Sequence, residues 1–249
     1  MIKIDEVETY GWQAAIRGMR NPKNSWDKSD TTQCCGCDKD CASFNNKLCV
    51  GNADLKLMET LGAAGTDHGK YLRMITVTAD ITAPLYWWKE YDTYKVGTVA
   101  NSCSTMHKIQ AKEFVLSDFS TEHLSATNLI VFSMVIDAMN NARLDFLQRK
   151  DKKDWWQMIQ MLPTCYNQKR TVQLNYAVLK NMYHSRQNHK LDEWREFCKW
   201  VESVHAGKLT GPSSWDGYVA CVAGDALNAS RGTSQFMKVE TMEKPEMYK

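Results

Sequence analysis

The sequence predicts an α+β fold, and three observations support this class. A strand-like segment opens the chain, a β-branched segment over residues 71–84 favours another strand, and most of the second half repeats apolar residues at helical spacing. The chain has 249 residues, of which 43% are hydrophobic, so it can bury a sizeable core. We therefore expect a single domain over residues 1–249.

The elements at the start of the chain are short. Residues 2–7 favour a strand and residues 12–19 a short helix, and a polar loop containing Asn, Pro and Ser follows over 21–32. Residues 32–50 contain five closely spaced cysteines. We expect an insertion loop over this segment.

Helical spacing returns over residues 53–65, where a glycine ends the pattern, as is common for helices. The segment "YLRMITVTADIT" then has the β-branched composition of a strand with one buried face. Pro84 closes this strand.

The second half is predicted to be mostly helical. We expect helices over residues 124–147 and 151–163, and a helix pair over 170–186 and 192–204 joined by "QNHK". The polar tail over 230–249 has little periodicity and is expected to be extended or disordered. The helix expected over residues 124–147 has an apolar stripe that suits a core helix. The stripe is formed by Ile130, Met134, Val135, Ala138, Met139, Ala142 and Phe146.

Charge and hydropathy exclude some classes of protein. The formal net charge is +2 and the pI is near 8.0, which argues against a nucleic-acid scaffold. The first residues lack the pattern of a signal peptide, and no apolar run approaches the roughly 20 residues that span a bilayer. We expect a cytoplasmic protein without a membrane segment.

The nine cysteines fall into two groups. Four of them lie far apart and are expected to be reduced, partly buried thiols: Cys103, Cys165, Cys198 and Cys221. In the insertion loop, four thiolates could close a tetrahedral zinc site that acts as a structural staple, namely those of Cys34, Cys37, Cys41 and Cys49. The alternative is a loop of free or oxidisable thiols without metal, because the spacing lacks two separated Cys-x-x-Cys pairs.

Common catalytic motifs do not occur in the sequence. The six histidines are scattered, and there is no Gly-x-Ser-x-Gly, P-loop or dinucleotide glycine fingerprint. An aromatic segment over 83–94 precedes a polar loop over 101–108. Aromatic faces can stack a planar ligand and Lys, Ser and Asn can hold its phosphates. Side chains such as Tyr86, Trp87, Trp88 and Tyr91 are nevertheless more often packed in a core than arranged around a ligand.

The segment "AGTDHGKYLRMITVTADITAPLYWWKEYDTYKVGTVANSCSTMH" resembles the flavin-dependent thymidylate synthases of bacteria and their phages. In that family a His-rich turn leads into a strand ending in Ala-Pro, then an Arg-His-Arg segment, then Ser-x-Asn-Glu-x-Ser-x-Arg-Tyr. Downstream, the pair Leu162–Pro163, the residues Asn175, Asn181 and Arg186, and a second helix are similar to the family's C-terminal pattern.

This resemblance implies a central, mostly antiparallel sheet flanked by long helices, and a homotetramer with FAD at its subunit interfaces. It implies methylation of the pyrimidine nucleotide dUMP, with carbon from methylenetetrahydrofolate and hydride from flavin reduced by NADPH. Arg186 is the implied catalytic residue, which holds and polarises the pyrimidine. The implied substrate-binding residues are Glu90, Asn101, Ser102, Ser104, His107 and Lys108. The implied cofactor-binding residues are Thr93, Tyr94, Lys95, Asn175 and Asn181.

The sequence departs from the family at charged positions. Thr93, Tyr94 and Lys95 replace Arg-His-Arg, and Ala177 stands where an arginine commonly contacts FAD. In the second motif the glutamate, arginine and tyrosine positions hold Ser102, Met106 and His107. We expect His107 and Lys108 to supply a substitute cation for a phosphate.

Two alternatives stand beside this interpretation. One keeps the fold without catalysis, as a nucleotide-binding or interaction protein whose cleft is filled by Trp87, Trp88, Tyr94 and Met106. The other makes the cysteine segment a zinc-stabilised loop that binds nucleic acid or a partner, which the near-neutral charge disfavours.

Overall fold

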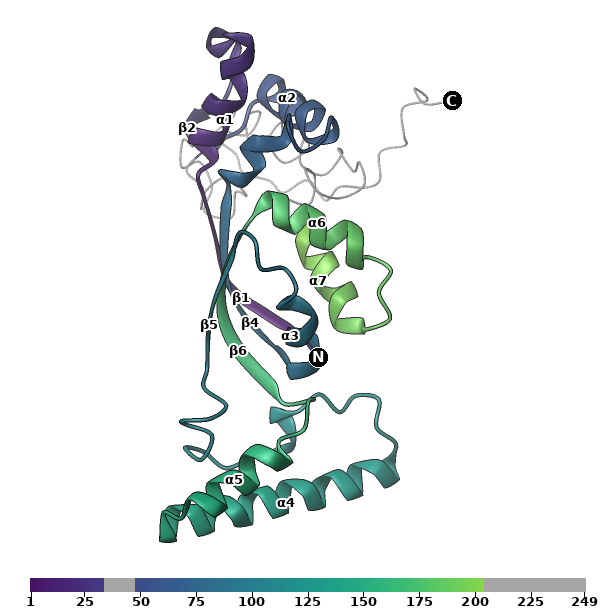
Figure 1. The fold of residues 1–249 in the computed structure, drawn as a ribbon. Helices are drawn as coiled ribbons and strands as arrows, with labels where there is room; N and C mark the ends of the chain where they lie inside the picture. Colours follow the sequence, from purple (N-terminus) through teal and green to yellow (C-terminus); the bar gives the residue numbers. More distant parts are fainter. Residues whose placement is uncertain (34–47, 204–249) are drawn as a thin grey trace, which may run out of the picture. The chain divides into compact units, whose positions relative to one another are not determined.

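The computed structural model describes residues 1–33 and 48–203. Four strands form the main sheet in the order β1-β4-β6-β5 (Figure 1). They are β1 (Lys3–Tyr10), β4 (Thr76–Pro84), β6 (Asn167–Asn175) and β5 (Thr98–Ser102). The sheet is antiparallel, which confirms the predicted α+β class.

The chain divides into two compact units, which we describe separately. Unit 1 contains Met1–Val7, Ala79–Gln173 and His189–Phe197. Unit 2 contains the described residues of Glu8–Thr78, Leu174–Asn188 and the segment from Cys198 onward.

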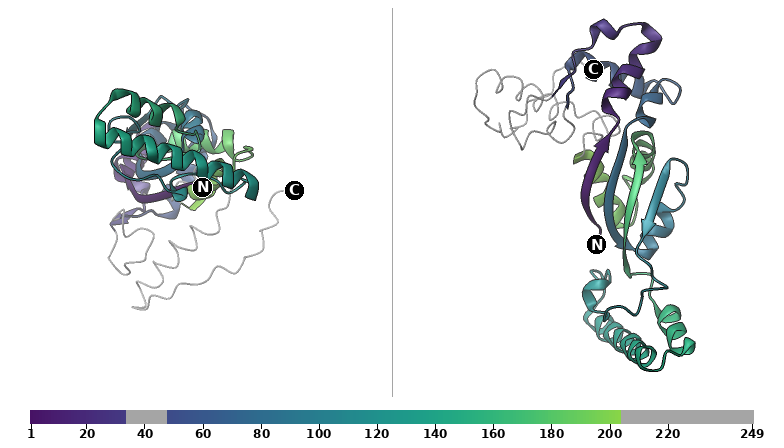
Figure 2. Two further views of the ribbon diagram at one scale, coloured as in Figure 1. Left: turned by 90° about the horizontal axis from the view of Figure 1, so that it is seen from below. Right: turned by 90° about the vertical axis from the view of Figure 1, so that its left-hand side faces the viewer.

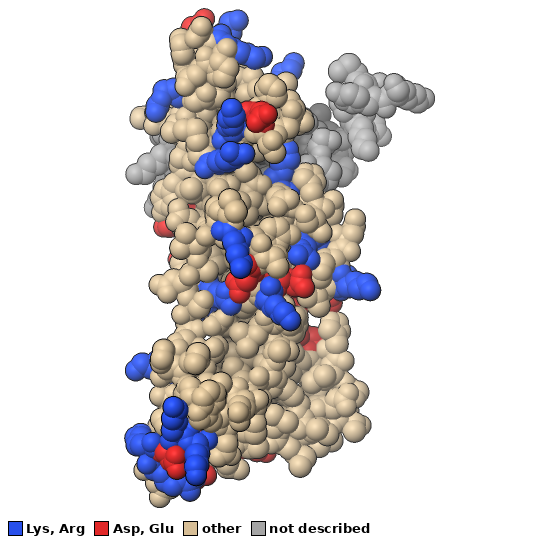
Figure 3. All heavy atoms as spheres, in the orientation of Figure 1, with Lys and Arg blue, Asp and Glu red and all other residues tan. Residues whose placement is uncertain are grey.

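A helical hairpin in unit 1 consists of α4 (Ala126–Arg149) and α5 (Lys152–Met161), which lie side by side in both views of Figure 2. The turn between them is defined by Lys150, at φ 57°, and by Asp151, whose side chain caps α5. Lysine and arginine side chains gather at this turn, at the lower end of Figure 3, together with acidic partners. Arg149, for example, pairs with both Asp145 and Asp154. These ion pairs between Arg149 and its acidic partners therefore stabilise the turn that connects α4 and α5.

An aromatic cluster forms the other core of unit 1. The helix α3 (Leu85–Tyr91) begins directly after Pro84 and buries the rings of Trp87, Trp88 and Tyr91. The Trp87 ring lies 4.8 Å from the ring of Trp194, which is on α7 (Asp192–Ser203). The core interpretation of these aromatic residues is confirmed, although Tyr86 is half-buried.

The main helices among the described residues of unit 2 are three α-helices and one 3-10 helix. They are α1 (Trp12–Arg20), α2 (Asn52–Ala63), η3 (Gly69–Arg73) and α6 (Tyr176–Arg186). The Tyr176 backbone amide donates to the carbonyl oxygen of Ile75 at 3.0 Å, and its ring packs edge-on against that of Trp12. These contacts fix the start of α6 against the core of the unit. Two further 3-10 turns, η1 (Asn21–Lys23) and η2 (Trp26–Lys28), follow α1, and the short strands β2 (Thr32–Gln33) and β3 (Leu48–Cys49) pair antiparallel.

A buried ion pair holds the loop after α1. Arg20 Nε lies 2.5 Å from the Asp54 carboxylate on α2, and both side chains are almost fully buried. The same carboxylate accepts hydrogen bonds from the hydroxyls of Ser29 and Thr31, both at 2.6 Å. A carboxylate with so many donors ties the loop to the helix.

Several predicted elements are corrected. Residues 170–175 were expected to begin a helix, but they belong to strand β6, in which buried and exposed side chains partly alternate. Along α4 the predicted core stripe is divided, because Met139 and Ala142 are buried whereas Ile130 and Met134 are 67% and 66% exposed. Ala138 is exposed as well.

The cysteine predictions are tested only in part. Cys103, Cys165 and Cys198 are free thiols, as expected, but Cys103 is exposed and so the prediction of partial burial is wrong for it. Cys34, Cys37, Cys41, Cys221 and the tail over 230–249 lie outside the described residues. The predicted single domain stays a prediction.

Candidate functional site

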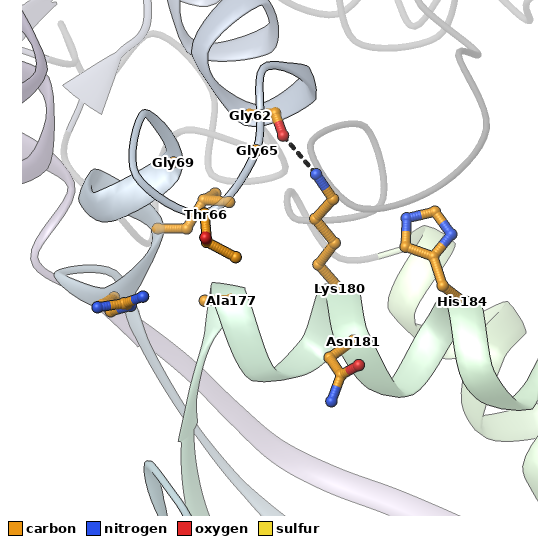
Figure 4. A pocket seen from close by; sticks show the side chains of 10 residues that line it. Gly62, Gly65, Thr66, Gly69, Ala177, Lys180, Asn181 and His184 are labelled. Carbon is orange, nitrogen blue, oxygen red and sulfur yellow. Dashed lines mark hydrogen bonds between the residues drawn. The ribbon is translucent and has the colours of Figure 1, made fainter.

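A cavity of about 300 Å³ lies along one side of α6 in unit 2, and we call it the α6 pocket. Its walls come from the end of α2, the connection to η3, η3 itself and α6 (Figure 4). The lining residues are Gly62, Gly65, Thr66, Gly69, Leu72, Arg73, Ala177, Lys180, Asn181 and His184.

The α6 wall follows from the spacing of its residues. Ala177, Lys180, Asn181 and His184 stand at positions i, i+3, i+4 and i+7, which share one face of a helix. The opposite face carries the buried residues Leu179, Met182 and Tyr183. The sequence of α6 therefore leaves a polar face free to line a cavity.

The facing wall depends on glycine. Gly65 adopts φ +102° in the connection after α2, a conformation that side chains rarely tolerate. The Gly69 amide donates to the Gly65 carbonyl oxygen at 2.9 Å and so begins η3. Glycine at Gly62, Gly65 and Gly69 also exposes backbone to the cavity, since these positions carry no side chain.

The polar groups of the pocket favour an anionic ligand. Arg73 and Lys180 are cationic, and Thr66 and Asn181 add a hydroxyl and an amide. Among the described lining residues there is no aspartate or glutamate. Lys180 Nζ donates a hydrogen bond to the Gly62 carbonyl oxygen, which is drawn as the dashed line in Figure 4. That bond orients the ammonium group along the cavity wall.

The predicted residues of α6 have different surroundings. Asn181 lines the pocket, as does Ala177. Asn175 is the N-cap of α6, and its side-chain oxygen accepts from the Val178 amide at 3.1 Å. The side-chain oxygen of Asn175 is therefore engaged in capping α6.

Arg186 is the last residue of α6 and is half-buried. On an ideal helix it lies about 140° from Asn181 and about 180° from Ala177. It shares the face of Leu179 and Met182, and it is not among the residues that line the α6 pocket. One ligand could contact both Asn181 and Arg186 only if α6 ended near Arg186, and the helix does end there. Of these two residues, however, only Asn181 lines the α6 pocket.

The predicted cofactor residues of unit 1 form a turn after α3. The Thr93 hydroxyl donates to the carbonyl oxygen of Glu90 at 2.7 Å. The ring of Tyr94 lies 6.2 Å from that of Trp194, at the border of the aromatic cluster. Lys95 is exposed. These residues are therefore close together in sequence and fold, with one of them packed on the core.

The predicted substrate-binding residues of unit 1 form a second group. Asn101 and Ser102 lie on strand β5 and are exposed, as are His107 and Lys108 in the loop that follows. Ser104 Oγ accepts hydrogen bonds from the backbone amides of Met106 and His107, at 3.2 and 2.8 Å. The Met106 side chain is 47% exposed, so it does not fill an interior space within unit 1.

The sequence prediction missed four polar residues of the α6 pocket: Thr66, Arg73, Lys180 and His184. The spacing of Lys180 and His184 relative to Asn181 was a usable signal, because it defines one helix face. Thr66 and Arg73 had no such signal, since they come from a connection and a 3-10 helix far away in the sequence.

Metal and membrane predictions can be compared with the described residues alone. Residues 1–33 and 48–203 contain no group of three or more His, Cys, Asp or Glu side chains that could hold a metal ion. The predicted zinc ligands fall outside this range, except Cys49, whose side chain is not described. In the same residues no helix is long and apolar enough to cross a membrane.

Comparisons with known proteins give two kinds of likeness. No protein-family model matches the chain. Short matches link it to inositol 2-dehydrogenases of Streptomyces avermitilis, 41% identical over 54 residues, and of Klebsiella pneumoniae, 46% identical over 54 residues. These matches cover 22% of this chain and 16% of each dehydrogenase, so the chain spans a small part of these relatives.

Solved structures match over most of the chain. Thymidylate synthase X from Helicobacter pylori, solved with FAD and dUMP, superposes with a TM-score of 0.59 at 17% identity, over 84% of this chain and 95% of that one. A second structure of this flavin-dependent enzyme with FAD and dUMP gives a TM-score of 0.57 at 18% identity, over 82% and 95%. The chain therefore has the fold of the flavin-dependent thymidylate synthases.

Proposed function

We propose that this chain is a divergent flavin-dependent thymidylate synthase-like protein that binds FAD and a pyrimidine nucleotide. The observation that supports this best is the α6 pocket, a cationic cavity free of described carboxylates in a chain with this fold. The proposed reaction is the reductive methylation of dUMP, or a related one-carbon transfer to a pyrimidine ring.

The α6 pocket suits part of a flavin nucleotide. At about 300 Å³ it lies at the lower end of the range for ligand pockets. Arg73 and Lys180 would hold negative charge, and Asn181 offers both a donor and an acceptor to the edge of a ring. When bound, FAD reduced by NADPH would supply the hydride, and methylenetetrahydrofolate the carbon.

The nucleotide would be held by other residues of the chain. In this proposal Asn101, Ser104, His107 and Lys108 contact dUMP. Arg186 is the proposed catalytic residue. Lysine offers a point charge in place of the planar fork of arginine. Each charged hydrogen bond that is lost without replacement weakens binding by about 1.5–3 kcal/mol, so we expect weaker nucleotide binding than in a member with every arginine.

A homo-oligomer is part of the proposal, and α4 supports it. Ile130, Val131 and Met134 are 67%, 56% and 66% exposed and lie within one turn of the helix. Three such side chains form an apolar patch that a second copy would cover. We propose a tetramer on the basis of the family resemblance.

A second candidate function is a non-catalytic protein of the same fold. Trp87 and Trp88 are fully buried among aromatic neighbours, and Thr93 and Tyr94 stand where the family has arginine and histidine. Such a protein would bind a nucleotide or a partner without turnover.

The test is an activity assay on the full chain. The purified protein is mixed with FAD, NADPH, methylenetetrahydrofolate and dUMP, and the release of the hydrogen at C5 of dUMP is followed. We expect release in the wild type, loss in Arg186→Ala, and no change in Arg195→Ala, which removes an exposed arginine of α7. Binding of both ligands without release would favour the second candidate, and failure to bind FAD would refute the first.

A further inference from the structure

The two cations of the α6 pocket differ in what they already contact. Lys180 donates to the Gly62 carbonyl oxygen, so one of its three donors is occupied. The Arg73 side chain is exposed at the end of η3, and within residues 1–33 and 48–203 its guanidinium makes no hydrogen bond or ion pair. As far as the described residues are concerned, all the donors of Arg73 are therefore available to a ligand in the cavity.

The chemistry of a guanidinium favours a particular ligand group. Its planar fork matches the oxygens of phosphate in a bidentate manner, whereas an ammonium acts as a point charge. Lys180 lies in the same cavity, and no carboxylate of the described lining competes for either cation. A phosphate between them would be compensated by two positive charges.

We propose that Arg73 anchors a phosphate group in the α6 pocket, with Lys180 as the second cation. The inference rests on the proposed function for the identity of the ligand, since the phosphate would belong to FAD or to dUMP. It assigns the phosphate contact to η3, which carries none of the residues that the sequence resemblance singled out.

The experiment measures how much phosphate contributes to binding. Dissociation constants are determined by calorimetry for FMN against riboflavin, and for dUMP against deoxyuridine, because the two ligands of each pair differ by one phosphate. Arg73→Ala is compared with Lys70→Ala, which removes an exposed cation of the same 3-10 helix that does not line the pocket. Thermal unfolding of both variants shows that the fold is retained.

We expect Arg73→Ala to weaken the binding of FMN or of dUMP by about ten- to a hundredfold, the range for a charged hydrogen bond. Riboflavin and deoxyuridine should bind as in the wild type, and Lys70→Ala should change none of the four constants. The affected pair identifies the source of the phosphate. Equal weakening of the phosphorylated and phosphate-free ligands, or no change in any, would overturn the inference.

A separate titration distinguishes this inference from the proposed function. If the wild type binds no flavin and no pyrimidine nucleotide, the proposed function fails. Inorganic pyrophosphate is then titrated into the same proteins. Binding that is lost in Arg73→Ala but kept in Lys70→Ala would support the phosphate anchor, and the absence of pyrophosphate binding in the wild type would overturn it.

Discussion

Replacing Asp54 by asparagine tests the buried ion pair of unit 2. The Asp54 carboxylate accepts from Arg20 Nε at 2.5 Å, from the hydroxyls of Ser29 and Thr31 at 2.6 Å, and from the backbone amides of Asp30 and Thr31 at 3.2 and 3.0 Å. The substitution would leave Arg20, which is 4% exposed, as an unpaired buried charge. Breaking such a pair costs about 3–5 kcal/mol. We expect the free energy of unfolding to fall by that amount.

The assay for Asp54→Asn combines urea unfolding with hydrogen exchange. Exchange should accelerate in residues 20–31 and 52–58, which the carboxylate joins, because the loop loses its attachment to α2. Asp27→Asn is the matched control, since Asp27 is exposed on η2. A loss below about 1 kcal/mol, or exchange that increases evenly over unit 2, would show that the Asp54 carboxylate does not hold the loop to α2.

The same carboxylate predicts a dependence of stability on pH. Burial alone would raise the pKa of Asp54, but hydrogen bonds from Ser29, Thr31 and Arg20 outweigh burial and hold the pKa below its ordinary value of 3.8. Because the folded-state pKa is the lower one, the stabilisation is present above pH 3.8 and is lost as the pH falls through the folded-state pKa. Unfolding free energy should therefore fall more steeply on acidification in the wild type than in Asp54→Asn.

Three further outcomes follow from burial and exposure. Trp87→Ala should lower the free energy of unfolding by about 3–5 kcal/mol, because the ring is fully buried; a loss below 1 kcal/mol in urea unfolding would contradict the packing. Ile130→Glu should dissociate the proposed homo-oligomer in light scattering, whereas Lys152→Glu should not; an unchanged mass would exclude this face of α4 as the interface. Burial raises the pKa of the Cys198 thiol to about 11, and Glu202 adds to the rise. An alkylating reagent at pH 8 should therefore label the exposed Cys103 before Cys198, as followed by peptide mapping. Equal labelling of the two thiols would contradict that order.

A strand in which buried and exposed residues alternate strongly could be predicted from the sequence. Strand β4 buries every second residue from Val77 to Ala83, and its β-branched composition and Pro84 marked both its type and its end. Strand β6 was mistaken for helix because its few apolar residues, Val172 and Leu174, continue into the helical spacing of α6. The side chain of Asn175, which caps α6, marked the boundary between them.

The face of a helix that is buried could be predicted less well. Apolar residues repeat along α4 on more than one side, so sequence alone does not say which side meets the core. Met139 and Ala142 contact the core of unit 1, whereas Ile130 and Met134 remain exposed. An apolar helix face covered by another copy of the chain has the same sequence pattern as a face buried within one chain.

The candidate site was predicted in part because its residues come from separate elements. Asn181 followed from the resemblance and lines the pocket. Arg73 stands on a 3-10 helix whose position depends on the turn at Gly65, and neither residue carries a motif. Contacts that the fold creates between distant segments have no local signal in the sequence.

Hydrogen exchange with and without saturating FAD shows whether the α6 pocket binds a flavin nucleotide. We expect slower exchange in residues 62–73 and 177–184, the two segments that contain the lining residues. Protection confined to other segments, or none at all, would contradict it.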